Sequence, residues 1–171
     1  LATQNPVEQE GVYVLPEAQV DRFLIKLTLP YPTTEEERRI LATYNEPVAD
    51  VGAVLDPETV LGLAAEAERV HIAPELLAYV VRLVQATREH PAVLLGASPR
   101  ASLALMRCSK ARAMLQGRAF VLPDDIRALA TAILAHRLIL TPEADLDRVI
   151  SGRVVEECLE QTTYAPVAEP T

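Results

Sequence analysis

Five basic side chains lie in a stretch of the sequence that contains no acidic residue. The chain has 171 residues and a net charge of −8, yet neither Asp nor Glu occurs between His90 and Pro123. The basic residues of that stretch are Arg100, Arg107, Lys110, Arg112 and Arg118. Taking their five positive charges away from the total leaves −13 for the rest of the chain. A positive region on a negative protein is suited to attract an anionic group.

Two of these cations lie where one anion could meet both. Arg100 directly follows Ser98-Pro99, a pair that predicts the start of a helix. Arg107 comes seven residues later and projects from the same face, an arrangement that suits a compact phosphate. Two other interpretations stay open. One is a solvated basic face that pairs with acids of neighbouring helices, and the other is a non-catalytic helix that binds nucleic acid in helix-turn-helix manner. The acidic net charge argues against nucleic acid.

Cysteine and histidine form no pattern that indicates chemistry. Cys108 and Cys158 stand within helical patterns and lack the CxxC or Cys/His spacing of a disulfide framework or a zinc site. Both are interpreted as small core residues. The three histidines stand far apart, without the pairing that metal ligation requires. We therefore expect no metal ligands in this chain.

Most of the chain has the periodicity of helices. Apolar residues recur at helical spacing in segments that open with a capping residue or with proline. A capping box of Thr33 and Glu36 predicts the first of these helices. The composition, rich in Ala, Leu and Val and without Trp, also favours helices. The predicted helices cover about 33–44, 57–70, 74–89, 98–117, 123–134 and 146–161.

The first thirty residues follow a different pattern. Leu1 to Gln4 has the character of the end of an apolar strand, and residues 23–29 alternate with the period of two expected of a second strand. We therefore predict a mainly α fold, in which a helical bundle is preceded by a small two-strand remnant of an α/β core. The expected domains are a core end at 1–31, a connecting helix and linker at 32–50, a helical domain at 51–165, and a tail at 166–171. Because the chain begins with Leu1 inside an expected strand, it looks cut from a longer protein.

Three sequence runs, in the expected order, resemble the MoxR family of AAA+ ATPases. They are Thr3-Gln4-Asn5-Pro6 with Glu8-Gln9-Glu10-Gly11, then Leu15-Pro16-Glu17-Ala18-Gln19-Val20-Asp21-Arg22-Phe23, and Gly96-Ala97-Ser98-Pro99-Arg100-Ala101. The second run favours MoxR over the related chelatase subunits and replicative helicases. The resemblance covers nearly the whole chain. It implies that the helical bundle is an AAA+ lid domain and that the full protein binds and hydrolyses ATP with Mg²⁺.

The resemblance also assigns roles to three residues. Asn5 matches sensor 1, whose amide orients the attacking water beside the γ-phosphate. Arg22 matches the arginine finger, which reaches the nucleotide of a neighbouring subunit. Arg100 matches the sensor 2 arginine of the lid, and the resemblance leaves open whether it reads its own nucleotide or a neighbour's. Taken without the family pattern, Asn5 could be a turn residue and Arg22 could form a local ion pair with Asp21.

The sequence also departs from a complete ATPase. No GxxxxGK[ST] phosphate loop occurs, and no apolar run ends in the Asp-Glu pair that would hold Mg²⁺. We therefore predict that this chain alone is inactive, with ATP and Mg²⁺ bound only by the full-length protein. By resemblance that protein forms a hexameric ring and works with a von Willebrand A-type partner on client proteins as a chaperone. Without a signal sequence or an apolar span of ~18 residues, a cytoplasmic location is expected.

Overall fold

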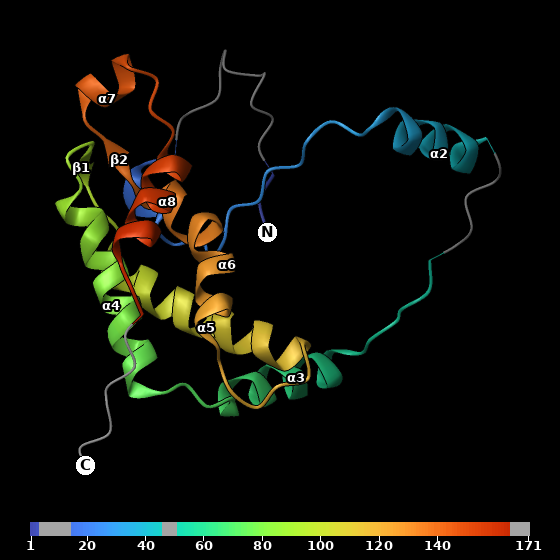
Figure 1. The fold of residues 1–171 in the computed structure, drawn as a ribbon. Helices are drawn as coiled ribbons and strands as arrows, with labels where there is room; N and C mark the ends of the chain where they lie inside the picture. Colours follow the sequence, from blue (N-terminus) through green and yellow to red (C-terminus); the bar gives the residue numbers. More distant parts are fainter. Residues whose placement is uncertain (4–14, 46–50, 165–171) are drawn as a thin grey trace.

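Four helices form the body of the molecule. In the computed structural model the described residues are 1–3, 15–45 and 51–164. The body consists of α4 (Pro74–Glu89), α5 (Pro99–Leu115), α6 (Pro123–Leu134) and α8 (Ser151–Gln161). Helix α5 contacts α4 and α6, and α8 packs against the same two helices (Figure 1). The fold is therefore mainly helical, and a helical bundle makes up its core, as the sequence predicts.

The interior of this bundle is closely filled by aliphatic side chains and one tyrosine. Tyr79 is fully buried and meets the ring of Tyr164 edge-on at a centroid distance of 6.1 Å. Cys158 is buried as well, which confirms its interpretation as a core residue, whereas Cys108 is half-buried. The other large side chains of the core include Leu83, Val84, Leu105, Ile126, Ile133, Leu134, Val154 and Val155.

Helix starts follow the predicted capping chemistry. The Ser98 side chain accepts a hydrogen bond from the backbone N–H of Arg100 at the start of α5. Asp56 caps α3 (Pro57–Arg69), and Thr33 forms the predicted capping box with Glu36 at the start of α2 (Thr34–Tyr44). The predicted starts of these three helices lie within two residues of the observed ones, because a side-chain acceptor at a fixed position decides where a helix can begin.

A small antiparallel sheet, which the sequence did not predict, closes one end of the bundle. It pairs β1 (Val93–Leu95) with β2 (Ile139–Leu140). Between α6 and β2 the chain makes one turn of 3-10 helix, η1 (Ala135–Arg137), and a short helix α7 (Pro142–Leu146) follows β2. The predicted helix over 146–161 therefore begins too early. Arg148 adopts a positive φ of 56°, which ends α7 and separates it from α8.

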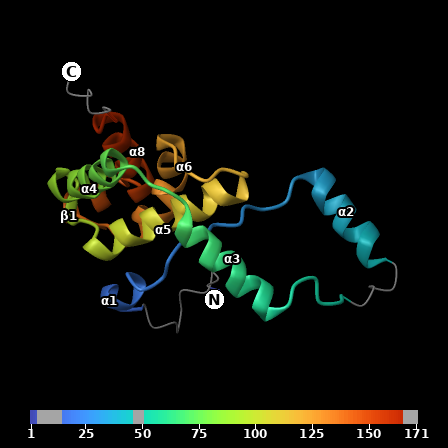
Figure 2. The same ribbon diagram turned by 90° about the horizontal axis from the view of Figure 1, so that it is seen from below.

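Two helices before the body are held less tightly. Helix α3 packs on α5, whereas α2 stands apart from the bundle in both views (Figures 1 and 2). None of the 11 residues of α2 is buried. Within the described part of the chain, no helix combines the length and apolar character needed to cross a membrane.

The segment before α2 does not form the strands predicted for it. After the single turn of α1 (Glu17–Val20), residues 21–22 form a turn, and residues 23–33 form no strand. Of the residues expected on one face of that strand, Ile25 packs against the core of the bundle, while Leu27 and Leu29 are exposed. A strand requires the backbone of a partner strand. Among the described residues, the backbone group that bonds residues 23–29 from outside the turn after α1 is a helix carbonyl, the Ala132 oxygen, which accepts from the Lys26 N–H at 3.0 Å. The expected strand end at Leu1 to Gln4 is not seen in residues 1–3, and Gln4 lies outside the described residues.

Candidate functional site

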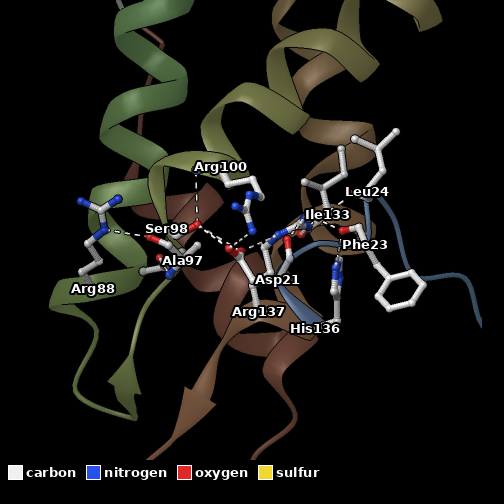
Figure 3. A network of polar contacts seen from close by, with 11 residues as sticks. Asp21, Phe23, Leu24, Arg88, Ala97, Ser98, Arg100, Ile133, His136 and Arg137 are labelled. Carbon is white, nitrogen blue, oxygen red and sulfur yellow. Dashed lines mark hydrogen bonds and ion pairs between the residues drawn. The ribbon is translucent and has the colours of Figure 1, made fainter. Parts of the chain in front are cut away.

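Asp21 lies at the centre of a cluster of polar contacts between the N-terminal segment and the bundle (Figure 3). Its two carboxylate oxygens accept hydrogen bonds from the Ser98 hydroxyl, each at 3.0 Å. The same carboxylate accepts from Nη1 of Arg100 at 3.3 Å and from Nε of Arg137 at 3.2 Å. Three side chains that are distant in sequence from Asp21 therefore converge on one carboxylate.

Arg137 extends this contact from the side chain to the backbone. It lies in η1 directly after α6, and its side chain is only 2% exposed. Its guanidinium donates to the carbonyls of Asp21, Phe23 and Leu24, and also to the carbonyl of Ile133 in α6. Burial lowers the pKa of Arg137, and the Asp21 carboxylate opposes that effect. A buried guanidinium stays charged and therefore needs such partners, which fixes the segment 21–24 beside η1.

The turn before α5 places Ser98 and Arg100 by backbone contacts with the end of α4. The Ala97 N–H donates to the Thr87 hydroxyl at 3.1 Å, and Nε of Arg88 donates to the Ala97 carbonyl at 2.8 Å. A Cβ on Gly96 would stand 2.6 Å from the Cα of Arg88, so only glycine permits this approach. Residues 96–100 therefore form a close-packed turn that places the first turn of α5 next to Asp21.

Arg100 retains access to solvent despite its contact with Asp21. Its side chain is 54% exposed, and the contact uses one terminal nitrogen of a guanidinium that has five N–H donors. The residue also lies in the first turn of a 17-residue helix, where the helix dipole favours an anion. These features leave part of the Arg100 guanidinium accessible to an anion. The hypothesis that Arg100 and Arg107 meet one phosphate stays a prediction.

The other two candidate residues differ in what the structure says of them. Asn5 lies outside the described residues. Arg22 is exposed and directly follows Asp21, and its backbone N–H donates to the Gln19 carbonyl at 3.2 Å in the turn after α1. In the described residues the ion pairs of Asp21 are with Arg100 and Arg137. The local Asp21–Arg22 pair considered from the sequence is therefore not formed.

Three of the five basic residues in the acid-free stretch are paired with other parts of the chain. Arg118 and Arg112 both pair with the buried Asp125 at the start of α6. Nζ of Lys110 donates to the Glu68 carbonyl at the end of α3, at 2.8 Å. Structural pairing with neighbouring helices, one of the interpretations left open, thus accounts for most of this charge. Little of it is left to support nucleic-acid binding.

Comparison with known proteins identifies the architecture. Residues 85–158 match the family model of the AAA lid domain, and residues 1–25 match a model described as ATPase family associated with various cellular activities. A solved structure of a candidate ATPase from Cytophaga hutchinsonii superposes with a TM-score of 0.90 at 37% identity, over 95% of this chain and 53% of that one. Chaperone MoxR1 of Mycobacterium tuberculosis is 39% identical over 97% of this chain and 46% of its own length. The chain belongs to the MoxR family of AAA+ ATPases.

A further relative extends the same similarity. YeaC of Bacillus subtilis is 44% identical over 93% of this chain and 50% of its own length. The MoxR-family chain thus spans about half the length of the curated relatives it matches. The matched lid model covers α5, α6, most of α8 and the last five residues of α4, which confirms the lid assignment of the bundle.

Sequence reasoning missed Arg137, the residue of this MoxR-family lid that makes most contacts to the segment preceding Arg22. A signal was present, because Arg137 interrupts the otherwise apolar run from Ala130 to Leu140 beside only one threonine and one histidine. When such an apolar run is buried, an arginine within it requires a hydrogen-bonding or charged partner. Asp21 was considered only as a partner for Arg22, and Ser98 only as a helix cap.

Proposed function

We propose that these residues form the C-terminal part of a MoxR-type ATPase that couples ATP binding and hydrolysis to remodelling or maturation of client proteins. The proposal keeps the domain division expected from the sequence: core end at 1–31, connecting helix and linker at 32–50, lid at 51–165, tail at 166–171. Within it, Arg22 is the arginine finger, Arg100 is sensor 2 and Asn5 is sensor 1. The contact of Arg100 with the residue before Arg22 carries the proposal, because it brings the two phosphate-directed arginines into one cluster.

Arg100 has the exposure and position to bind a phosphate oxygen. Its guanidinium is anchored at one nitrogen by Asp21, and the positive end of α5 adds to the attraction for an anion. When phosphate binds, Asp21 and the phosphate compete for the same cation. The lid would thereby respond to the presence of the nucleotide.

Arg22 is proposed to act on a neighbouring subunit. Its exposure on a turn at the edge of the lid suits a guanidinium that reaches across an interface. There it would offset the charge that develops on the transferred phosphoryl group. That role requires a ring, which we propose to be hexameric. A von Willebrand A-type partner and protein clients complete the proposed assembly.

ATP and Mg²⁺ themselves would be held by residues that this sequence does not contain. The 171 residues include no phosphate loop and no Asp-Glu pair after an apolar run, so they do not fit a complete nucleotide site. We propose that the chain alone neither binds ATP with useful affinity nor hydrolyses it. Calorimetry on the isolated chain tests this statement, and micromolar binding would contradict it.

Two substitutions in the complete ATPase test the assigned roles. Arg22→Ala should leave nucleotide binding nearly intact and reduce turnover by ~10³ to 10⁵, the range known for arginine fingers. Arg100→Ala should weaken nucleotide binding as well as turnover, since that arginine contacts phosphate in the ground state too. Arg153→Ala in α8 is the control, because Arg153 pairs with Glu156 and Glu157 of its own helix, and it should change neither. Turnover of Arg22→Ala equal to wild type would remove the finger assignment.

A mixing experiment tests whether Arg22 acts between subunits. Arg22→Ala subunits are combined with subunits that lack the phosphate-loop lysine. Some interfaces of the mixed ring then join an intact pocket to an intact finger, so ATP turnover should partly recover. Mixed rings that recover no turnover count against action in trans.

A further inference from the structure

The segment that carries Arg22 is attached to the lid at several points. The Lys26 N–H donates to the Ala132 carbonyl in α6, and Ile25 packs against the lid core. The imidazole of His136 in η1 bonds the Phe23 carbonyl through Nε2, at 3.3 Å. Together with the Asp21 contacts, bonds to the lid involve Asp21, Phe23, Leu24 and Lys26, on both sides of Arg22.

Arg137 contributes the largest share of these attachments. It alone bonds the Asp21 carboxylate together with the carbonyls of Asp21, Phe23 and Leu24. Its side chain is almost fully buried, and its further bond to the Ile133 carbonyl fixes it to the end of α6. A planar guanidinium donates in fixed directions, so these bonds define one position for the backbone around Arg22.

We propose that Arg137 is a positioning residue for Arg22, so that the lid of a subunit sets the position of the finger at the end of that subunit's core. The inference rests on the proposed role of Arg22 as the finger. Ser98 and Arg100 hold Asp21 from the start of α5, and Arg137 holds it from the end of α6. A rotation of the lid that follows the nucleotide bound in one subunit would therefore carry Arg22 toward or away from the next subunit.

The first experiment measures the attachment itself in the 171-residue chain. Amide hydrogen exchange is followed by NMR at Lys26, whose N–H bonds the lid, and at Leu105 in the lid core. Arg137→Met should speed exchange at Lys26 at least tenfold and leave Leu105 unchanged. Asp21→Asn, which leaves the lid interior intact, should speed Lys26 exchange as well.

Arg127→Met is the matched control for this measurement. Arg127 also projects from α6 and donates to a main-chain carbonyl, that of Leu159, but the structure gives it no bond to residues 21–26 among those described. It should leave Lys26 exchange unchanged. Unchanged Lys26 exchange in both Arg137→Met and Asp21→Asn overturns the inference. Equal acceleration at Lys26 and Leu105 also overturns it, because Arg137 would then support only the stability of the lid.

The second experiment separates positioning from binding in the complete ATPase. Arg137→Met should lower kcat by ~10 to 100-fold, the scale of a misplacement of about 1 Å, with KM for ATP within about twofold of wild type. Arg127→Met should leave both constants unchanged. If Arg22→Ala abolishes turnover while Arg137→Met releases the segment and leaves kcat unchanged, the positioning role is wrong. If Arg22→Ala retains full turnover, the finger assignment fails instead, and the exchange at Lys26 still reports whether the segment is attached to the lid.

Discussion

Arg118 and Asp125 form a two-pronged ion pair across the turn that joins α5 to α6. The two guanidinium nitrogens of Arg118 lie 2.8 and 2.7 Å from the two carboxylate oxygens of Asp125. Asp125 is only 2% exposed, and its carboxylate also accepts the N–H of Leu122 at 2.8 Å. The pair therefore fixes the start of α6 to the end of α5. Such geometry is typical of the strongest charge-assisted hydrogen bonds.

Removing the Asp125 carboxylate should destabilise the lid strongly. Asp125→Ala leaves Arg118 and Arg112 without their partner and the Leu122 N–H without its acceptor. We expect a loss of about 3 to 5 kcal/mol in the free energy of unfolding. Urea denaturation of the 171-residue chain measures it, with Asp124→Ala, an exposed neighbour, as the control. A loss below about 1 kcal/mol would show that the pair is not structural.

The same carboxylate should make the chain sensitive to acid. Burial by itself raises the pKa of Asp125, but the hydrogen bonds from Arg118 and Leu122 and the nearby positive charges lower it below its ordinary value. An acid whose pKa is lowered by folding stabilises the fold above its unfolded pKa, about 3.9, and that contribution is lost as the pH falls further. The free energy of unfolding should therefore drop below about pH 4 more steeply in wild type than in Asp125→Asn. Parallel curves for the two proteins would contradict this.

His136 should make the free energy of unfolding depend on pH in a second, less acidic range. Burial and the charge of Arg137 lower the pKa of His136, so the folded state binds its proton less readily than the unfolded state. Stability should therefore decrease as the pH falls below about 6.5, the usual pKa of histidine. His136→Gln can still offer an N–H to the Phe23 carbonyl and should lack this decrease. Urea unfolding between pH 5 and 8 measures the slope, and His71→Gln, at an exposed histidine, should retain it.

Gly96→Ala should disturb the turn that positions Arg100. The new Cβ would stand 2.6 Å from the Cα and 2.7 Å from the N of Arg88, and neither backbone atom can move alone. We expect destabilisation of ~1 to 3 kcal/mol. Gly62→Ala is the control, because Gly62 lies within α3 with nothing within 4 Å of its added Cβ and should gain up to ~1 kcal/mol. Thermal unfolding compares the two, and equal stability of both variants would contradict the close approach.

Limited trypsin digestion should cut first within α2. An isolated helix of 11 residues is marginally stable in water, and Arg38 and Arg39 lie in its exposed middle. Lys26 lies in the segment bonded to the lid and should resist cleavage longer. Mass spectrometry of early products identifies the sites. Cleavage after Lys26 before Arg38 or Arg39 would show that the segment is not held against the lid.

The sequence predicted the elements that depend on local chemistry. Helix ends are marked by caps such as Ser98 and Asp56 and by Gly117, which has a positive φ. At each of these positions, particular residue types meet the local hydrogen-bonding or conformational requirement of the backbone. The sheet of β1 and β2 was not predicted, since its five residues carry too little periodicity to distinguish them from loops. The Asp21 cluster escaped prediction for another reason. Its members are separated by up to 116 residues, and nothing in the local sequence reports which arginine meets which acid.

The contacts of residues 21–26 also determine where chimeric proteins of this family can be joined. Consider a hybrid that takes the residues up to Pro30 from one protein and the lid from another. Its Asp21 would then meet Arg137 and Ser98 of a different protein. A junction placed before Asp21 transfers both sides of the contact together. Hybrid ATPases built with the junction before Asp21 should therefore assemble a correctly seated lid more often than hybrids cut at the apparent end of the core.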